Sequence, residues 1–185
     1  MLDLFIEQLA NNLGFIYYVL VYGVGIVSMV LSTVAFQFKK RVAIVLCSSL
    51  GQTSWVIYFL LQADLVSAIA CGLSAIILAL FTKQAEWKWV KSPICILMCI
   101  LVLSGFSIWS FAVWSDVFPI LAGIFAVIAN SRTSEKRLRQ FSIFWCGSWL
   151  LNSLFKMYPV ALINDLFCTV STAVALVRYR EKAKG

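Results

Sequence analysis

The polar side chains of this sequence that could bind a ligand lie inside apolar runs, at helical spacing. Ser48, Gln52 and Trp55 follow one another at i, i+4 and i+7, so they share one face of a helix. Trp149 and Asn152 share a face in a later run. An amide beside an indole suits a small polar solute, because the amide exchanges hydrogen bonds and the indole stacks on a ring. The alternative is that Gln52 and Asn152 form interhelical hydrogen bonds that hold a bundle together.

A second polar face lies near the end of the chain, in the run VALINDLFCTVSTAVALVRYR. Asp165 and Cys168 share a helical face there, with Asn164 at its edge. Asp165 is roughly 9 Å along a helix that Pro159 would start. We expect one of two environments for this carboxylate: water at the outer mouth of the protein, with Lys156 as a partner, or a central cavity in which it handles a solute or a proton.

An earlier run carries a smaller polar stripe, Ser67 and Cys71. The residues that we expect to bind a solute are therefore Gln52, Trp55, Ser67, Cys71, Trp149, Asn152, Asn164, Asp165 and Cys168. The chain contains no histidine, which excludes Ser-His and Cys-His catalysis and histidine-ligated metal sites. Its six cysteines lie in apolar runs without the spacing of a zinc ribbon. We expect no catalytic residue, no metal site and no cofactor, and the chain is not predicted to be an enzyme.

The elements that position these residues must be membrane helices. The chain is 62% hydrophobic and 12% charged, with a mean hydropathy of +0.94, whereas a soluble domain carries about 25% charged residues. Seven apolar blocks predict helices, at 15–36, 42–61, 65–81, 94–112, 117–130, 141–155 and 160–177. We divide the fourth from the fifth at Trp114–Asp116, because a single helix over both would be about 55 Å long against a hydrocarbon core of about 30 Å.

The charged residues alternate between the loops. Fourteen of the fifteen lysines and arginines fall in the loops that follow the first, third, fifth and seventh blocks. The other loops hold Asp64, Asp116 and the remaining lysine, Lys156. By the positive-inside rule the amino terminus lies outside and the carboxyl terminus in the cytoplasm. The same distribution explains the formal charge of +7 through contact with the lipid bilayer, without a nucleic-acid partner.

The first residues, MLDLFIEQLANNLGF, are acidic and contain no lysine or arginine, unlike the basic start of a signal peptide. Their apolar side chains fall on one helical face, which predicts either a short surface helix or an early start to the first membrane helix.

The order of blocks and loops occurs twice. A shift of 97 residues places Lys39 on Lys136 and Cys71 on Cys168, and three helices with the same loop charges occupy 15–83 and again 117–180. The helix at 94–112 connects them. The prediction is an all-α, polytopic membrane protein with a single membrane domain over 1–185. Its seven transmembrane helices form two parallel three-helix bundles, joined by a linker helix and related by an axis along the membrane normal.

Four stretches make the chain resemble the YgjV-type bacterial inner membrane proteins over nearly its whole length: GIVSMVLSTVAFQFKKR, WVIYFLLQADLVSAIACGLSAIILAL, PILAGIFAVIAN and INDLFCTVSTAVALVRYR. The resemblance implies a multi-pass protein of the bacterial cytoplasmic membrane. The layout is more distantly similar to SWEET sugar carriers and PnuC-type vitamin carriers, which implies a solute site on the second, third, sixth and seventh helices. The chain departs from the sugar carriers in having no asparagine on the third helix and no proline in the first, second and sixth.

These observations predict a carrier or facilitator of a small polar solute, sugar-like or vitamin-like, that works by alternating access. The absence of hinge prolines and the thin polar lining favour an alternative, a non-transporting membrane protein that binds a protein partner or a lipid. The sequence leaves the substrate, the coupling ion and homo-oligomerisation open.

Overall fold

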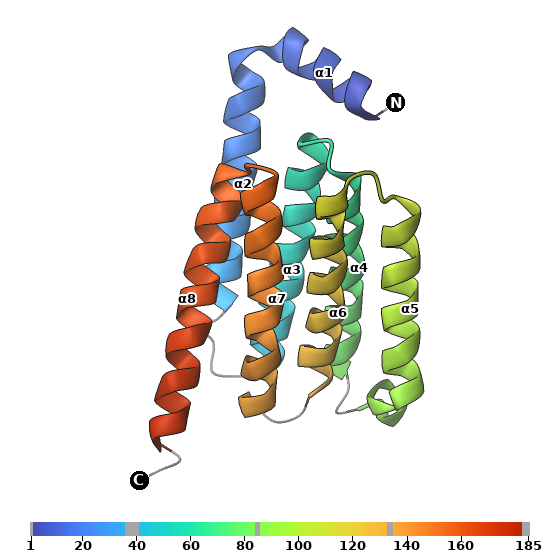
Figure 1. The fold of residues 1–185 in the computed structure, drawn as a ribbon, viewed down its shortest axis with the longest axis vertical. Coiled ribbons are helices and arrows are strands. Elements are labelled where there is room, and N and C mark those ends of the chain that lie inside the picture. Colours follow the sequence, from blue (N-terminus) through green and yellow to red (C-terminus); the bar gives the residue numbers. More distant parts are fainter. Residues whose placement is uncertain (1, 36–40, 84–85, 133–134, 183–185) are drawn as a thin grey trace.

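The computed structural model describes residues 2–35, 41–83, 86–132 and 135–182. Within these residues the chain forms eight α-helices and two short 3-10 helices (Figure 1). Their bounds are α1 Leu2–Leu13, α2 Phe15–Ala35, α3 Arg41–Leu61, α4 Leu65–Thr82, η2 Lys88–Lys91, α5 Pro93–Trp109, η3 Trp114–Asp116, α6 Val117–Ser131, α7 Glu135–Phe155 and α8 Pro159–Lys182.

Helices α2 to α8 lie on the seven predicted apolar blocks, and the predicted break between the fourth and fifth is confirmed at η3. Three ends differ from the prediction by three residues or more. Helix α7 starts at Glu135, six residues before the predicted start at 141. Helix α5 stops at Trp109, and Ser110 caps it, so the expected extension to residue 112 is wrong. Helix α8 runs on to Lys182, past the predicted end at 177. Helices α7 and α8 extend past their apolar blocks because hydropathy marks only the apolar part of a helix, whereas the helical hydrogen bonds continue into polar residues.

The amino-terminal segment is a helix of its own. Gly14 has a φ of +50°, a left-handed conformation that suits glycine and interrupts the helix between α1 and α2. Helix α1 then lies across one end of the bundle (Figure 1). Ile6, Leu9 and Leu13 pack against the core, while Leu4 and Phe5 are exposed. Of the two predicted alternatives, the separate surface helix is therefore the one that the structure contains.

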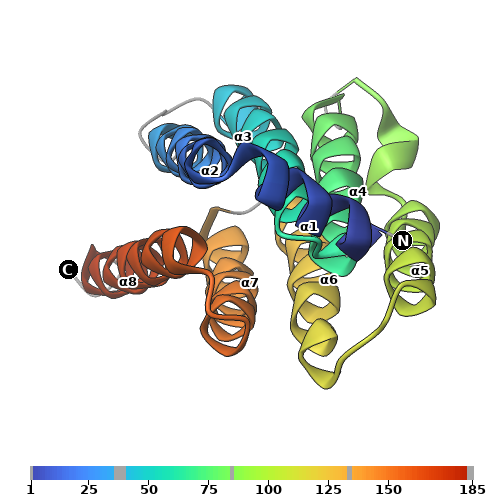
Figure 2. The same ribbon diagram turned by 90° about the horizontal axis from the view of Figure 1, so that it is seen from above.

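The other helices stand in two rows. Seen along the helices, α2, α3 and α4 form one row, α8, α7 and α6 form the other, and α5 lies beyond them beside α4 and α6 (Figure 2). Neighbours within each row are packed together, and the rows also touch at both ends, where α2 contacts α8 and α4 contacts α6. The middle helices, α3 and α7, face each other across the space that the site occupies.

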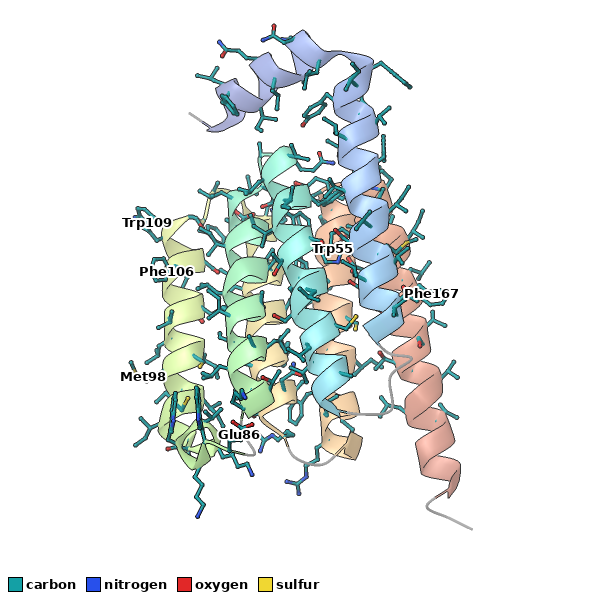
Figure 3. All side chains as sticks on the ribbon, turned by 180° about the vertical axis from the view of Figure 1, so that it is seen from behind. Trp55, Glu86, Met98, Phe106, Trp109 and Phe167 are labelled. Atoms are coloured by element: carbon teal, nitrogen blue, oxygen red, sulfur yellow. The ribbon has the colours of Figure 1, made fainter. Side chains whose placement is uncertain are left out.

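The outer faces of the rows are apolar and exposed. Figure 3 shows Met98, Phe106 and Trp109 of α5 and Phe167 of α8 pointing away from the bundle. Within the described residues, three helical segments are long and apolar enough to cross a membrane: Phe15–Val34, Leu65–Thr82 and Trp114–Ser131. Three further segments are apolar but shorter: Val45–Leu61, Pro93–Trp109 and Pro159–Val174. The protein is thus an all-helical bundle whose surface suits a lipid environment.

Two turns at the same end of the bundle have the same geometry. In the α3–α4 turn, the amide nitrogens of Gln62, Ala63 and Asp64 donate to the carbonyls of residues 58, 60 and 59. In the α7–α8 turn, residues 156, 157 and 158 donate to 152, 154 and 153, the same pattern 94 residues later (156 − 62). Ala63 and Met157 both have a positive φ, 57° and 55°. The two turns correspond at a spacing of 94 residues, three fewer than the shift of 97 that the sequence suggests for the repeat.

Candidate functional site

A cavity of about 60 Å³ lies between the two rows, at the middle helices. Five helices contribute its lining, which consists of Ser32, Ser48, Gln52, Trp55, Phe59, Cys71, Trp145, Cys146, Trp149, Ala161, Asn164, Asp165 and Cys168. The lining residues of α3 extend from Ser48 to Phe59, about 16 Å of helix at 1.5 Å per residue. The cavity is therefore a site within the depth of the bundle.

The structure brings most of the predicted solute-binding residues together at this cavity. Seven of the nine are among its lining residues: Gln52, Trp55, Cys71, Trp149, Asn164, Asp165 and Cys168. The other two, Ser67 and Asn152, are buried and lie outside it. The amide nitrogen of Asn152 donates to Ser67 Oγ over 3.3 Å, which is the interhelical hydrogen bond that the alternative for Asn152 predicted.

Asp165 is buried among neutral polar groups, with 9% of its surface exposed. Ser153 Oγ donates to its Oδ2 over 2.5 Å, and Asn164 Nδ2 donates to its Oδ1 over 3.1 Å. The expectation that Asp165 sits in water beside Lys156 is wrong, because the carboxylate faces the cavity and Lys156 bonds to other carboxylates. The structure places Asp165 at the central cavity, which is the second of the two expected environments.

Aromatic rings form a layer over one end of the cavity. Phe59 stacks on Trp149, with ring centroids 5.6 Å apart and planes at 12°, and on Trp55 at 5.8 Å. Tyr158 tilts against Phe59 at 5.8 Å. The Nε1 of Trp55 donates to Ser32 Oγ on α2 over 3.0 Å, which fixes the indole between two helices. The layer joins α3 to α7 and so links the two rows.

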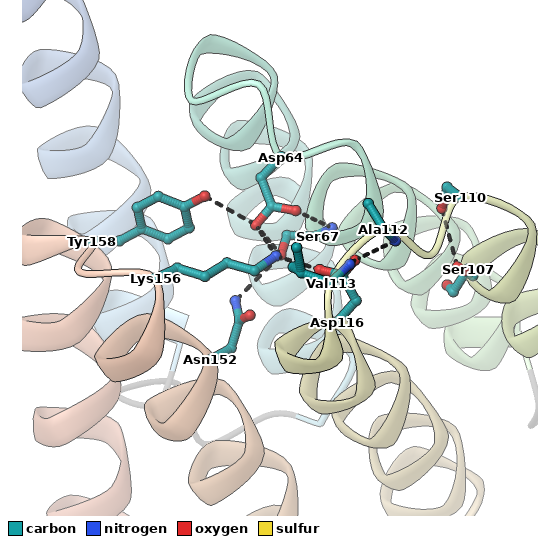
Figure 4. Close-up of polar contacts among 10 residues, drawn as sticks. All are labelled: Asp64, Ser67, Ser107, Ser110, Ala112, Val113, Asp116, Asn152, Lys156 and Tyr158. Atoms are coloured by element: carbon teal, nitrogen blue, oxygen red, sulfur yellow. Dashed lines mark hydrogen bonds and ion pairs between the residues drawn. The ribbon is translucent and has the colours of Figure 1, made fainter. Parts of the chain in front are cut away.

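Three charged side chains meet at the end of the bundle that holds the matching turns (Figure 4). Lys156 Nζ is 2.8 Å from Asp64 Oδ2 and 2.7 Å from Asp116 Oδ1. Asp64 caps α4 by accepting from the Ser67 amide over 3.1 Å. Asp116 accepts from two backbone amides of the preceding loop, at 2.8 and 2.9 Å. The network of Lys156, Asp64 and Asp116 thus ties three loops together.

Tyr158 and Ser67 complete the surroundings of Asp64. Ser67 Oγ donates to Asp64 Oδ2 over 2.6 Å, and the Tyr158 hydroxyl donates to the same oxygen over 3.2 Å. Burial raises the pKa of the Tyr158 phenol, and the neighbouring Asp64 carboxylate raises this pKa further. Tyr158 therefore remains a protonated donor. Through Ser67 the network continues to Asn152 in the last turn of α7.

The sequence reasoning missed several of these residues. Phe59 follows Trp55 by four residues and extends the stripe that begins at Ser48, so helical periodicity could have identified it. The charged network had a weaker signal: its three members are the only charges that the sequence assigns to the non-basic loops. Ser32 lies among apolar residues of α2, and no sequence pattern distinguishes it.

Comparison with protein families matches residues 19–183 to the family Imp-YgjV, described as bacterial inner membrane protein. The match covers all of α3 to α8 and most of α2. Curated proteins and solved structures give no match.

Proposed function

The chain belongs to the Imp-YgjV family of bacterial inner membrane proteins, and on that premise we propose that it carries a small polar solute across that membrane by alternating access. One observation carries the proposal: a cavity with amide, thiol, carboxylate and indole groups lies between two rows of helices, within the depth of the bundle. Polar groups are costly at such a depth in a membrane protein, and they commonly mark a solute or ion path.

The proposal treats the two rows as two parallel repeats, α2–α4 and α6–α8, with α5 as a linker and seven membrane crossings. The matching turns support it, since each follows the second helix of its row. At their spacing of 94 residues, Trp55 corresponds to Trp149 (149 − 55), and both indoles line the cavity. The contact of α2 with α8 has its counterpart in that of α6 with α4. Carriers built from repeats place their solute between the units and rock one against the other.

The aromatic layer and the charged network would act as the closed gate of such a carrier. Both connect the rows at one end of the bundle: Phe59 to Trp149, and Asp64 to Lys156. The cavity lining extends from this layer toward the opposite end, as far as Ser48. By the positive-inside rule that opposite end, with its basic loops, faces the cytoplasm. The structure would then be the state closed to the outside.

An uptake experiment tests the proposal. The purified chain is reconstituted in liposomes, and a panel of labelled neutral, cationic and anionic solutes is presented to wild type and to Trp149→Ala. We expect saturable uptake of at least one solute class by wild type, and its loss in Trp149→Ala, because the substitution removes an indole from the cavity and from the aromatic layer.

Trp109→Ala is the matched control, since Trp109 is an exposed tryptophan at the end of α5, outside the cavity. It should transport at the wild-type rate. If no solute enters, or if both variants behave alike, the carrier proposal fails, and a membrane protein that binds a partner without transport becomes the better explanation.

Thiol labelling tests the gate. In a variant that keeps Cys168 of the cavity lining as its single cysteine, an impermeant thiol reagent is applied to one face of the membrane at a time. We expect labelling from the basic face only, and labelling from both faces once Lys156→Met breaks the charged network. Labelling of the Lys156-containing protein from the opposite face would refute the assignment of the gate.

A further inference from the structure

We propose that the solute of this cavity is a small organic cation rich in N–H donors, of the alkylammonium or guanidinium class. The inference rests on the proposed carrier function and names its substrate class. It starts from a carboxylate in the cavity lining, Asp165, for which the described residues provide no ion pair.

The partners of Asp165 are neutral. A carboxylate offers about four acceptor positions, and two of them accept from Ser153 and Asn164. In the part of the chain that the structure describes, the ion pairs are Lys83 with Glu86 and Lys156 with two other aspartates. A buried ionised carboxylate needs a counter-charge or it takes up a proton. A cation in the cavity would supply that charge and use the remaining acceptor positions.

Gln52 gives an independent indication of the same ligand chemistry. Gln52 lines the cavity, its Oε1 is buried, and no hydrogen bond reaches this oxygen from the described residues. A buried acceptor without a donor is unfavourable, so the group that complements it carries N–H or O–H. Asp165 and Gln52 lie on helices of different rows, so one ligand with several donors would bridge the rows.

The rest of the lining favours positive charge over negative. It contains the indoles of Trp55, Trp145 and Trp149 and no lysine or arginine. Indole faces attract ammonium and guanidinium groups, whereas an anion would meet Asp165 without any compensating cation. The lining therefore suits an organic cation better than an anion.

Binding of matched pairs of solutes tests the charge requirement. Guanidinium and urea have nearly the same planar shape and differ by one charge, and methylammonium and methanol form a second pair. Each is titrated at millimolar concentration into the purified full-length chain in lipid nanodiscs, with tryptophan fluorescence as the readout. We expect saturable binding of the cations and at least tenfold weaker binding of urea and methanol. Equal binding of guanidinium and urea would overturn the proposal.

Two variants assign the effect to the cavity. Asp165→Asn keeps the shape and removes the charge, and we expect it to weaken guanidinium binding at least tenfold, while Glu86→Gln, which removes an exposed carboxylate, leaves binding unchanged. Gln52→Leu should weaken guanidinium binding several-fold, and it serves where Asp165→Asn does not fold, as judged by circular dichroism and gel filtration. Wild-type affinity in a folded variant of either residue would refute the site.

The two proposals fail in different ways. If liposomes take up urea or another neutral solute and exclude the cations, the carrier function stands and the cation inference is overturned. If no solute binds or crosses, both are overturned. If the cations bind and Asp165→Asn abolishes binding without any uptake by wild type, the cation site stands and the carrier function does not.

Discussion

Substitution of Lys156 by methionine is the most direct test of the charged network. The lysine side chain is 12% exposed, and its carboxylate partners Asp64 and Asp116 are 4% and 2% exposed. Methionine preserves most of the volume and removes the cation, so two carboxylates remain buried near each other. Removing one partner of a buried ion pair costs about 3–5 kcal/mol.

The structure places the expected loss near the lower end of that range. Asp64 keeps its hydrogen bonds from Ser67 and Tyr158, and Asp116 keeps two from backbone amides. These donors continue to stabilise the negative charges, so we expect Lys156→Met to lower the free energy of unfolding by about 3 kcal/mol. Reversible unfolding in mixed micelles with increasing dodecyl sulfate, followed by circular dichroism, measures this quantity.

Lys83→Met is the control, because Lys83 pairs with Glu86 at the surface, with 50% and 62% of the two side chains exposed. Exposed pairs of this kind contribute about 0–1 kcal/mol. A triple variant that adds Asp64→Asn and Asp116→Asn to Lys156→Met should recover at least about 1 kcal/mol, since it removes the unpaired charges. The reasoning is refuted if Lys156→Met loses no more stability than Lys83→Met, or if neutralising both aspartates restores nothing.

Two further substitutions test packing and the surroundings of Asp165. In Gly25→Ala the new Cβ would lie 2.9 Å from the ring of Tyr58, so we expect the free energy of unfolding to fall by about 1–3 kcal/mol in the same assay. Gly23→Ala is the control and should leave stability unchanged, because nothing lies within 4 Å of its new Cβ. An equal loss in both variants would contradict the contact with Tyr58. Ser153→Ala removes the donor at 2.5 Å from Asp165, for which we expect a loss of about 1.5–3 kcal/mol if the carboxylate is ionised. That loss should disappear in an Asp165→Asn background, and its persistence there would show that the hydroxyl acts through another contact.

Sequence alone determined where the helices lie and how they are divided. Long apolar runs predicted α2 to α8, and the length of a membrane-spanning helix predicted the break at Trp114–Asp116. Helical periodicity also selected most of the cavity lining, because Gln52 and Trp55 are fixed on one face whatever the helix packs against. These features depend on residues close together in the chain, so local physics is enough to predict them.

The sequence did not determine which residues of the first row correspond to which residues of the second. A shift of three residues is nearly one helical turn, so an apolar helix aligned at 97 or at 94 residues presents almost the same pattern of faces. The hydrogen bonds of the two turns distinguish the alignments, because a turn has a fixed start and end. In the proposed repeat, the spacing of 94 residues would make Trp149 the counterpart of Trp55.

Tertiary structure also decided which charges meet. The sequence offered Lys156 three carboxylates in or near loops at the same end, and their separation along the chain says little about distance in space. Packing of the rows brought Asp64 and Asp116 within 2.8 Å of the lysine and turned Asp165 toward the cavity. The attraction between two charges weakens as their separation increases. Separations of a few ångströms are fixed only by the arrangement of the helices.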